Sequence, residues 1–311
     1  MEDILRQVLI TGIGGFIGSK LAEYLSSINY EIVGLDKVLN AKIEPKTTEY
    51  IVVDLLNCDE NVINSYKVDY IVHCAGEASV DLHNTSQNTD YLATKKLLQI
   101  TKNSNIKKLI FLSSNKVDGE DHYSQSKFKI ESLIKSELCS FDISYTLIRC
   151  SIVYGRGMGS NIYKWLGLIK LRKIPALPKS ESRILMISVS DLCRCIEKCI
   201  SNPATDNKTY VVSDGIPYNI NEIELTARQA FSRTEKHLVC PRLLLFLASK
   251  LGDLLMNAGI RLPHNFRRYN MIFNNTAHIS NEFEKDTGFK ASTNFFQKFP
   301  LSFQRFKIIP W

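Results

Sequence analysis

The sequence lacks the patterns that mark several special classes of protein. Its 8 cysteines form no CxxC pair, which disfavours the usual zinc-binding and thiol-redox spacings. No charged and then apolar leader precedes residue 7, and no apolar run reaches the ~20 residues that a membrane-spanning helix needs. Internal repeats, low-complexity tracts and blocks of like charge are also missing. We therefore expect a cytoplasmic globular protein with reduced thiols, no bound metal and no transmembrane segment.

Two segments suggest a special role but have a simpler interpretation. Cys193, Cys195 and Cys199 lie close together, yet on a helix only the last two share a face, and no histidine is near them. We expect them to be buried as small apolar side chains. The longest apolar stretch, residues 243–255, is interrupted by two charged residues. We expect a helix packed within the protein there, with contact to a membrane surface as the alternative.

The composition is that of a folded globular protein. Hydrophobic residues make up 44% of the 311 residues and charged residues 23%. Because single cores stop growing near ~250–300 residues, this length favours one large domain, a smaller lobe and a cleft. The formal net charge of +7 suits an anionic ligand, but the Lys and Arg residues are scattered, so we expect no nucleic-acid partner.

The first half of the chain alternates short β-branched runs with helical patterns, as in successive βα units. Strands are predicted at residues 7–11, 31–36, 50–54, 70–74, 108–113 and 144–150. Helices are predicted at residues 16–28, 61–66, 90–103 and 124–138. This pattern predicts an α/β fold with a Rossmann-type, doubly wound parallel sheet.

The rhythm changes after residue 155. Isolated strands are predicted at residues 184–189 and 209–212, and helices at residues 191–200, 223–231 and 242–256. We therefore expect a dinucleotide-binding domain at residues 1–155. Residues 156–311 are expected to form mainly a smaller substrate-binding lobe, with some elements returning to the sheet.

A glycine-rich turn joins the first strand to the first helix. Gly12, Gly15 and Gly18 stand at GxxGxxG spacing. The first glycine allows a tight turn, the second brings bare backbone against a pyrophosphate, and the third allows helix and strand to approach closely. The helix amino terminus also favours phosphate. We predict a dinucleotide site here, with Gly14, Phe16 and Ile17 as further contacts.

Other cofactor contacts are expected where the next strands end. Asp36 closes the second strand, where a carboxylate accepts hydrogen bonds from the adenosine ribose. It favours NAD because it repels the 2′-phosphate of NADP, but the neighbouring Lys37 leaves NADP open. Further cofactor contacts are predicted after the third and fourth strands, at Asp54, Leu55, Cys74, Ala75 and Gly76.

A catalytic set is predicted at the fifth strand and the helix that follows it. Tyr123 and Lys127 stand four residues apart, so on a helix they share one face. Hydride transfer at an oxygen-bearing carbon needs a group that exchanges a proton with that oxygen, and a nearby ammonium lowers a tyrosine pKa from ~10. Ser114 could orient the same oxygen. We therefore predict Ser114, Tyr123 and Lys127 as catalytic residues, the last two also contacting the cofactor.

These motifs resemble the extended short-chain dehydrogenase/reductase family of nucleotide-sugar epimerases, dehydratases and reductases. Residues 11–18 resemble its TGxxGFIG segment, Ser113 and Ser114 its SS pair, and Tyr123 and Lys127 its YxxxK. Residues 148–155 resemble the first eight positions of its LRxxxVYGP segment, and Arg156 stands where that segment has its proline. The resemblance implies that tyrosine is the acid/base, lysine tunes it, serine orients the substrate and NAD(P) carries the hydride.

The same resemblance implies a partner and further site residues. The substrate is expected to be a nucleotide-diphosphate sugar, and the chain is expected to form a homodimer through the helices near residues 90–103 and 124–138. Substrate-binding residues implied by similarity are Lys116, Asn161, Arg183, Arg267 and Arg268.

Two features favour a reductase within this family. Residues 113–120, SSNKVDGE, resemble the SSxKVNGE of the UDP-4-keto-6-deoxy-N-acetylhexosamine reductases, which make UDP-N-acetylquinovosamine and related surface polysaccharide precursors. Asn115 and Lys116 stand where 4,6-dehydratases have an Asp-Glu pair. Only nine positions separate Ser114 from Tyr123, a shorter excursion than in family epimerases. The alternatives are a UDP-hexose or UDP-N-acetylhexosamine 4-epimerase with tightly held NAD, and a non-catalytic dinucleotide-binding scaffold.

Overall fold

The computed structural model describes residues 6–40, 42, 47–76, 84–119, 121–158, 161–232, 238–257, 266–275 and 277–303. The chain forms two compact units, each assembled from three segments. Unit 1 consists of Met1–Gly157, Ile187–Ser213 and Ser280–Ser292, and unit 2 of Met158–Met186, Asp214–Ile279 and Thr293–Trp311. Neither unit is therefore a continuous stretch of sequence.

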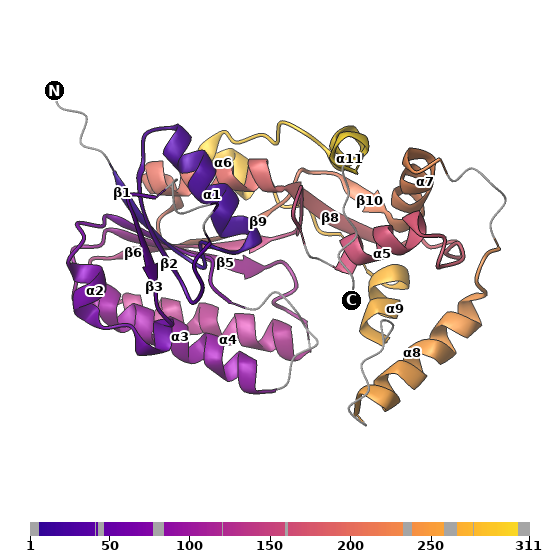
Figure 1. The fold of residues 1–311 in the computed structure, drawn as a ribbon, viewed down its shortest axis with the longest axis horizontal. Helices are drawn as coiled ribbons and strands as arrows, with labels where there is room; N and C mark the ends of the chain where they lie inside the picture. Colours follow the sequence, from indigo (N-terminus) through magenta and orange to yellow (C-terminus); the bar gives the residue numbers. More distant parts are fainter. Residues whose placement is uncertain are drawn as a thin grey trace. The chain divides into compact units, whose positions relative to one another are not determined.

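Unit 1 is built on a seven-stranded parallel sheet with the order β3-β2-β1-β4-β5-β6-β9 (Figure 1). Its strands are β1 (Gln7–Thr11), β2 (Glu31–Asp36), β3 (Glu49–Val52), β4 (Tyr70–His73), β5 (Lys108–Ser114), β6 (Ser144–Cys150) and β9 (Lys208–Val212), and the short β7 (Ile152–Tyr154) follows β6. Its helices are α1 (Phe16–Ser27), α2 (Glu60–Asn64), α3 (Asn84–Lys102), α4 (His122–Leu138), α6 (Val189–Ser201) and α10 (Glu282–Thr287). The strand order reverses at β1, so the Rossmann-type, doubly wound α/β fold expected from the sequence is confirmed.

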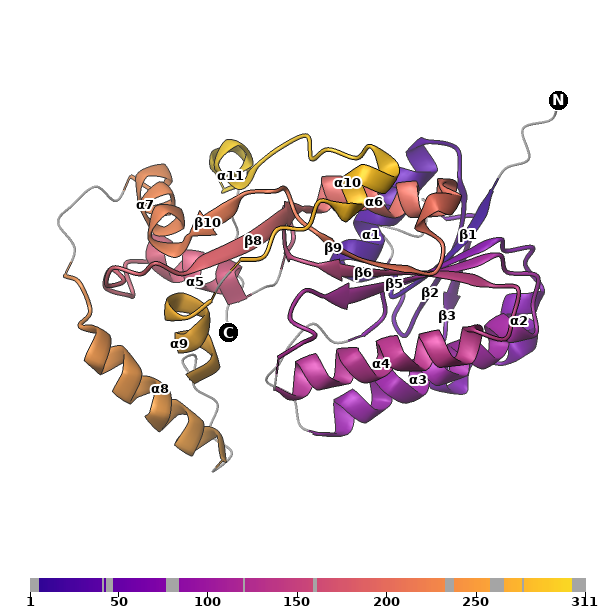
Figure 2. The same ribbon diagram turned by 180° about the vertical axis from the view of Figure 1, so that it is seen from behind.

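Helices cover both faces of this sheet. α3 and α4 lie on one face, and α1 and α6 lie on the other (Figures 1 and 2). Successive residues of β1 serve the two layers, because Leu9 packs in the α3–α4 layer while Val8 and Ile10 pack in the α1–α6 layer. Burial on both faces explains why these strands read as continuous apolar runs. It leaves the ends of the strands as the place for polar chemistry.

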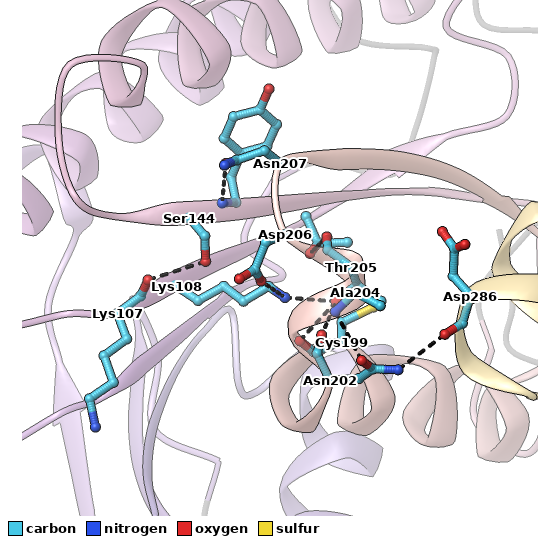
Figure 3. A network of polar contacts seen from close by, with 12 residues as sticks. Lys107, Lys108, Ser144, Cys199, Asn202, Ala204, Thr205, Asp206, Asn207 and Asp286 are labelled. Atoms are coloured by element: carbon cyan, nitrogen blue, oxygen red, sulfur yellow. Dashed lines mark hydrogen bonds and ion pairs between the residues drawn. The ribbon is translucent and has the colours of Figure 1, made fainter.

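One end of the sheet is closed by a polar network that joins β5 and β6 to the turn after α6 (Figure 3). The Lys108 side chain is only 4% exposed, and it donates to Thr205 Oγ1 at 2.7 Å and to Asp206 Oδ1 at 2.6 Å. Thr146 Oγ1 donates to the Thr205 carbonyl at 2.7 Å. A buried ammonium group is stable only when it is paired, so this network holds the strand edge together. The amino ends of β5 and β6 therefore have a structural task.

Some sequence-based boundaries differ from the structure. The isolated strand predicted at residues 209–212 is β9, which joins the main sheet as its seventh strand, with Val212 opposite Cys150 of β6. A short apolar run predicts a strand but cannot name its partner. α4 begins at His122 instead of residue 124, which places Tyr123 inside its first turn. β3 ends at Val52, two residues before its predicted end.

The three cysteines of α6 are buried apolar side chains, as expected. All eight cysteines are free, and Cys193, Cys195 and Cys199 are buried against α1 and the sheet. Burial raises the pKa of Cys193 and of Cys199 to about 12, so both thiols stay protonated at neutral pH. In the ranges that the structure describes, no three His, Cys, Asp or Glu side chains are grouped so that they could hold a metal ion.

Unit 2 contains an antiparallel strand pair and several helices. β10 (Pro217–Asn219) pairs with β8 (Arg183–Ser188), placing Tyr218 opposite Ile184. The helices are α5 (Asn161–Lys170), α7 (Ile220–Ala230), α8 (Arg242–Asn257), α9 (Phe266–Phe273) and α11 (Phe295–Phe303). α7 packs against α5 and α11, and its buried Arg228 and Glu224 pair at 2.7 Å. The sequence pattern missed β10, α5, α9 and α11.

The apolar segment at residues 243–255 differs most from expectation. It does form a helix, α8, which packs against α9. However, five of its leucines lie on the surface, so the expectation that they pack inside the protein is wrong. Over the part of the chain that is described, no helix combines the length and apolar character needed to cross a bilayer.

Candidate active site

A cavity of about 720 Å³ lies at the carboxyl ends of β1, β2, β3 and β4 in unit 1. Ligands of open parallel sheets bind at this edge, where the strand order reverses. The predicted cofactor residues that line the cavity are Gly12, Gly14, Gly15, Asp36, Asp54, Leu55, Cys74, Ala75 and Gly76. The structure therefore brings together residues from four separate β-strand ends.

The glycine turn leaves no room for side chains. Gly12 has φ +70°, and a Cβ there would lie 2.7 Å from the backbone N and Cα of Ala75. A Cβ on Gly18 would lie 2.3 Å from the Gly12 carbonyl oxygen. Gly15 is the N-cap of α1, and it has no side chain that could cover the first turn of the helix. The turn thus presents bare backbone and a helix amino terminus to the cavity, while Phe16, Ile17 and Gly18 form the first turn of α1.

Asp36 is held at the cavity wall by backbone amides. Its Oδ2 accepts the Gly14 N–H at 2.8 Å, and its Oδ1 accepts the Lys37 N–H at 2.7 Å. These bonds fix the carboxylate beside the glycine turn, where the sequence predicts a ribose. Lys37 Nζ lies 3.3 Å from Asp54 Oδ2. Lys37, the residue that kept NADP possible as the cofactor, is thus paired with a carboxylate. The pair is largely exposed and therefore weak.

Asp54 also has a structural task. Its side chain accepts the Leu56 N–H at 3.0 Å and caps the short 3₁₀ helix Leu55–Asn57. Capping orients this carboxylate at the cavity, and its predicted contact with the cofactor stays a prediction.

Sequence reasoning missed part of the cavity lining. The segment after β2 contributes Val38, Leu39 and Asn40, and α3 contributes Asp90 and Ala93. Asn40 Nδ2 donates to the Gly14 carbonyl at 3.2 Å, which ties this segment to the glycine turn. The sequence feature that could have identified the segment after β2 is its position, because residues directly after a strand end lie at the same edge of the sheet.

A buried histidine underlies the cavity. His73, the last residue of β4, lies with Nδ1 2.6 Å from Thr11 Oγ1 and Nε2 3.0 Å from Thr94 Oγ1. Burial, together with the positive charge of Lys127, lowers its pKa to about 3. The ring is therefore neutral at physiological pH and serves as a hydrogen-bonding link between β1, β4 and α3.

The two serines at the end of β5 have different surroundings. Ser113 Oγ donates to Glu131 Oε1 at 2.5 Å inside the protein. Ser114 Oγ accepts the N–H of Lys116, a predicted substrate-binding residue, at 3.2 Å. The Ser113 hydroxyl is engaged by Glu131, and the catalytic role of Ser114 stays a prediction.

The amino end of α4 carries the predicted Tyr–Lys pair. Asp121 caps the helix by accepting the Ser124 N–H at 3.1 Å, and half-buried Tyr123 follows in the first turn. Lys127, one turn on, is 8% exposed, and its Nζ lies 5.0 Å from the Phe111 ring centre. A Cβ on Gly76, a cavity-lining residue, would lie 3.5 Å from Lys127 Nζ. The ammonium group therefore lies at the edge of the cavity.

A buried ion pair fixes this helix to the sheet. Arg149 of β6 donates from Nη2 to Glu131 Oε2 at 2.8 Å and from Nε to Oε1 at 3.1 Å. Its pKa is raised chiefly by this hydrogen bonding to Glu131. Glu131 stands one turn after Lys127 on α4, so the pair sets the position of the helix face that bears the predicted catalytic residues. No role is predicted from the sequence for either residue of this pair.

The remaining predicted substrate residues belong to unit 2. Arg183 begins β8, and its Nη1 lies 3.8 Å from Glu222 Oε1. Asn161 begins α5, and Arg267 and Arg268 lie on α9, but their side chains are outside the described residues. Their roles stay predictions.

Comparisons with known proteins agree with the fold and the motifs. The family model described as "NAD dependent epimerase/dehydratase family" matches residues 8–213, more than half of the chain. A UDP-glucose 4-epimerase of Vibrio cholerae is 25% identical over 251 residues, which are 73% of this chain and 76% of the relative.

Solved structures show the same fold over nearly the whole chain. A UDP-glucose 4-epimerase of Thermotoga maritima, solved with UDP-glucose, has a TM-score of 0.76 at 15% identity, covering 96% of this chain and 97% of that one. A UDP-glucose 4-epimerase of Bifidobacterium longum, in complex with NAD⁺ and UDP, has a TM-score of 0.73 at 17% identity, covering 95% and 96%. At these identities the likeness shows the fold alone.

Proposed function

Because the chain belongs to the NAD dependent epimerase/dehydratase family, we propose that it reduces the 4-keto group of a UDP-linked 6-deoxy-N-acetylhexosamine with NAD(P)H. The short connection from β5 to α4 carries this proposal. It runs from Ser114 to His122 and contains Asn115 and Lys116 where a dehydratase needs carboxyl groups. Relatives in the family support an NAD-dependent nucleotide-sugar enzyme in general, and this connection supports the reductase in particular.

The cavity in unit 1 fits a dinucleotide. Added Cβ atoms on Gly12 and Gly18 would collide with backbone, so the turn is shaped for bare peptide next to a pyrophosphate. Gly14, Gly15 and the first turn of α1 would hold the phosphates, and Asp36 the adenosine ribose, which favours NAD. When bound, NAD(P)H supplies the hydride.

The chain's own residues would manage the proton. Tyr123 would donate a proton to the oxygen at C4 as it becomes an alcohol, and Lys127 would favour the phenolate that results. Ser114 would hydrogen-bond the same oxygen and orient it. The Glu131–Arg149 pair holds α4 in place while this happens.

The family resemblance implies the residues that would bind the sugar nucleotide. Arg183, Arg267 and Arg268 would bind its diphosphate through charge-assisted hydrogen bonds, Asn161 its base, and Lys116 its sugar. This assignment would explain the choice of a nucleotide-linked sugar over a free one. We also propose that the chain forms a homodimer through α3 and α4. It would act in the cytoplasm, in the synthesis of surface polysaccharide precursors.

A 4-epimerase is the second candidate, and the names of the relatives favour it. Several are UDP-glucose 4-epimerases, including those of Vibrio cholerae and Thermotoga maritima. An epimerase would use the same Ser114, Tyr123 and Lys127 with tightly held NAD. It differs in cofactor turnover, since the hydride returns to the sugar.

Cofactor consumption distinguishes the two candidates. The purified protein would be mixed with NADH or NADPH and a UDP-4-keto-6-deoxy-N-acetylhexosamine, and the loss of reduced-nicotinamide absorbance followed with product analysis. We expect one nicotinamide oxidised per sugar reduced. Conversion of a UDP-hexose to its C4 epimer without consumption would instead establish the epimerase. NAD binding without either turnover would support a scaffold.

A further inference from the structure

The outer face of α8 is made of leucines. They occupy positions that recur along one side of the helix, and their side chains are 53–67% exposed. The leucine face comprises Leu243, Leu244, Leu247, Leu251 and Leu254. An ordinary surface helix shows the opposite arrangement, because its apolar stripe is the part that packs. A continuous apolar stripe on the surface marks a contact site.

The inner face of α8 confirms that this orientation is built into its packing. Ser249 and Gly252 are buried, and the half-buried Phe246 stacks edge-to-face on Tyr269 of α9 with ring centres 5.6 Å apart. Arg242 Nε also donates to the Tyr269 hydroxyl at 3.1 Å. Small residues facing α9 let the two helices approach closely, and this pairing fixes the leucines on the outside.

The charge of the chain is divided unevenly between the units. Unit 2, which contains α8, has 17 Lys and Arg against 6 Asp and Glu, a formal charge of +11. Unit 1 has 22 Lys and Arg against 26 Asp and Glu, a formal charge of −4. The whole excess of positive charge therefore belongs to the unit that carries the leucine face.

Exposed basic and apolar side chains occur together in unit 2. Lys250 is exposed on α8, at a helical position that borders the leucine face. Before α8, Leu238 is 87% exposed and Val239 pairs with Ala176. The exposed Arg172 and Lys173 precede Ala176 by a few residues, so they lie on the segment that runs beside this extension of the apolar surface.

We propose that the leucine face of α8 docks on the surface of an anionic phospholipid bilayer. An amphipathic helix of this kind lies in the plane of the interface, with its leucines among the acyl chains. Basic residues on the same unit are then attracted to the anionic headgroups of the bilayer. The surface of a neutral partner protein would not provide this attraction. The enzyme binds the bilayer reversibly and from one side.

The test is flotation of the full chain with vesicles of phosphatidylcholine alone or mixed with phosphatidylglycerol. We expect binding to the mixed vesicles, little binding to the neutral ones, and weaker binding at high salt. Leu247→Gln with Leu251→Gln should reduce the bound fraction by roughly tenfold or more, since both leucines lose their apolar contact. Lys250→Gln should weaken binding to the anionic vesicles only.

Matched variants keep the test decisive. Leu225→Gln with Ile28→Gln removes two exposed apolar side chains outside α8 and should bind like the wild type. Thermal unfolding of each variant checks that it is folded, which is expected because none of the substituted side chains is buried. Equal binding of the α8 variant and the wild type would overturn the proposal. The proposal would also be overturned if the wild type failed to float and instead formed a concentration-dependent dimer that the α8 variant alone does not form. The leucine face would then contact a second copy of this chain.

Discussion

Acidification should destabilise the protein through His73. Its ring is buried between Thr11 and Thr94, and its pKa is lowered from 6.5 to about 3, by burial first and by Lys127 second. Between these two values the unfolded chain binds a proton at this residue and the folded chain does not. The stabilising contribution is therefore complete above pH ~6.5 and is lost as pH falls toward ~3.

The size of the effect follows from the shift. Each pH unit below ~6.5 costs ~1.4 kcal/mol, so at pH ~5 the loss from His73 is about 2 kcal/mol. Urea unfolding, followed by far-UV circular dichroism at pH ~7.5 and pH ~5, should be compared for the wild type and His73→Gln. Glutamine keeps a donor and an acceptor but cannot titrate. We expect the advantage of the wild type over the variant to shrink by about 2 kcal/mol at the lower pH.

A second variant separates titration from lost hydrogen bonding. Thr94→Val removes the contact at Nε2 but keeps the ring, so it should destabilise the protein by about the same amount at both pH values. If His73→Gln also gave one constant difference at both pH values, the ring would not be held neutral by the fold, and the reasoning would be refuted.

Three further predictions concern the site. Tyr123→Phe should lower kcat by ~100-fold or more while NAD(P) binding, measured by calorimetry, stays nearly unchanged, because only the proton donor is lost; retained turnover would contradict the mechanism. Asp36→Ala should weaken NAD binding by roughly tenfold and relax discrimination against NADP, since the carboxylate beside Gly14 is removed; an unchanged preference would remove Asp36 from the site. Gly18→Ala should destabilise unit 1 by ~1–3 kcal/mol in urea unfolding and abolish NAD binding, because its Cβ would lie 2.3 Å from the Gly12 oxygen.

The parts of the site that sequence predicts well are those encoded locally. The glycine turn, Asp36 and the residues after β4 follow directly from strand–turn–helix patterns, and they line one cavity. The spacing of Tyr123 and Lys127 is likewise local, because four residues on one helix share a face.

Pairings across long stretches of sequence could not be predicted. His73 lies in the apolar run of β4, where no pattern shows that Thr11 and Thr94 meet its ring. Glu131 resembles any charged residue on a solvated helix, and only the folded chain shows that Arg149 buries it. The orientation of α8 was missed for the same reason, because an apolar stripe predicts that something covers it without saying what.

The division of the chain into interleaved segments bears on how the protein folds during synthesis. Residues 280–292 complete unit 1, and Asp191 of α6 accepts both the amide and the hydroxyl of Ser292, a residue 101 positions later. Unit 1 can therefore begin to fold early on the ribosome but cannot finish until almost the entire chain has emerged. Contacts at such separations slow folding. Premature termination shortly before residue 280 would therefore leave the α6 side of unit 1 unfinished and present it to chaperones and proteases, even though every residue of the glycine turn had already been made.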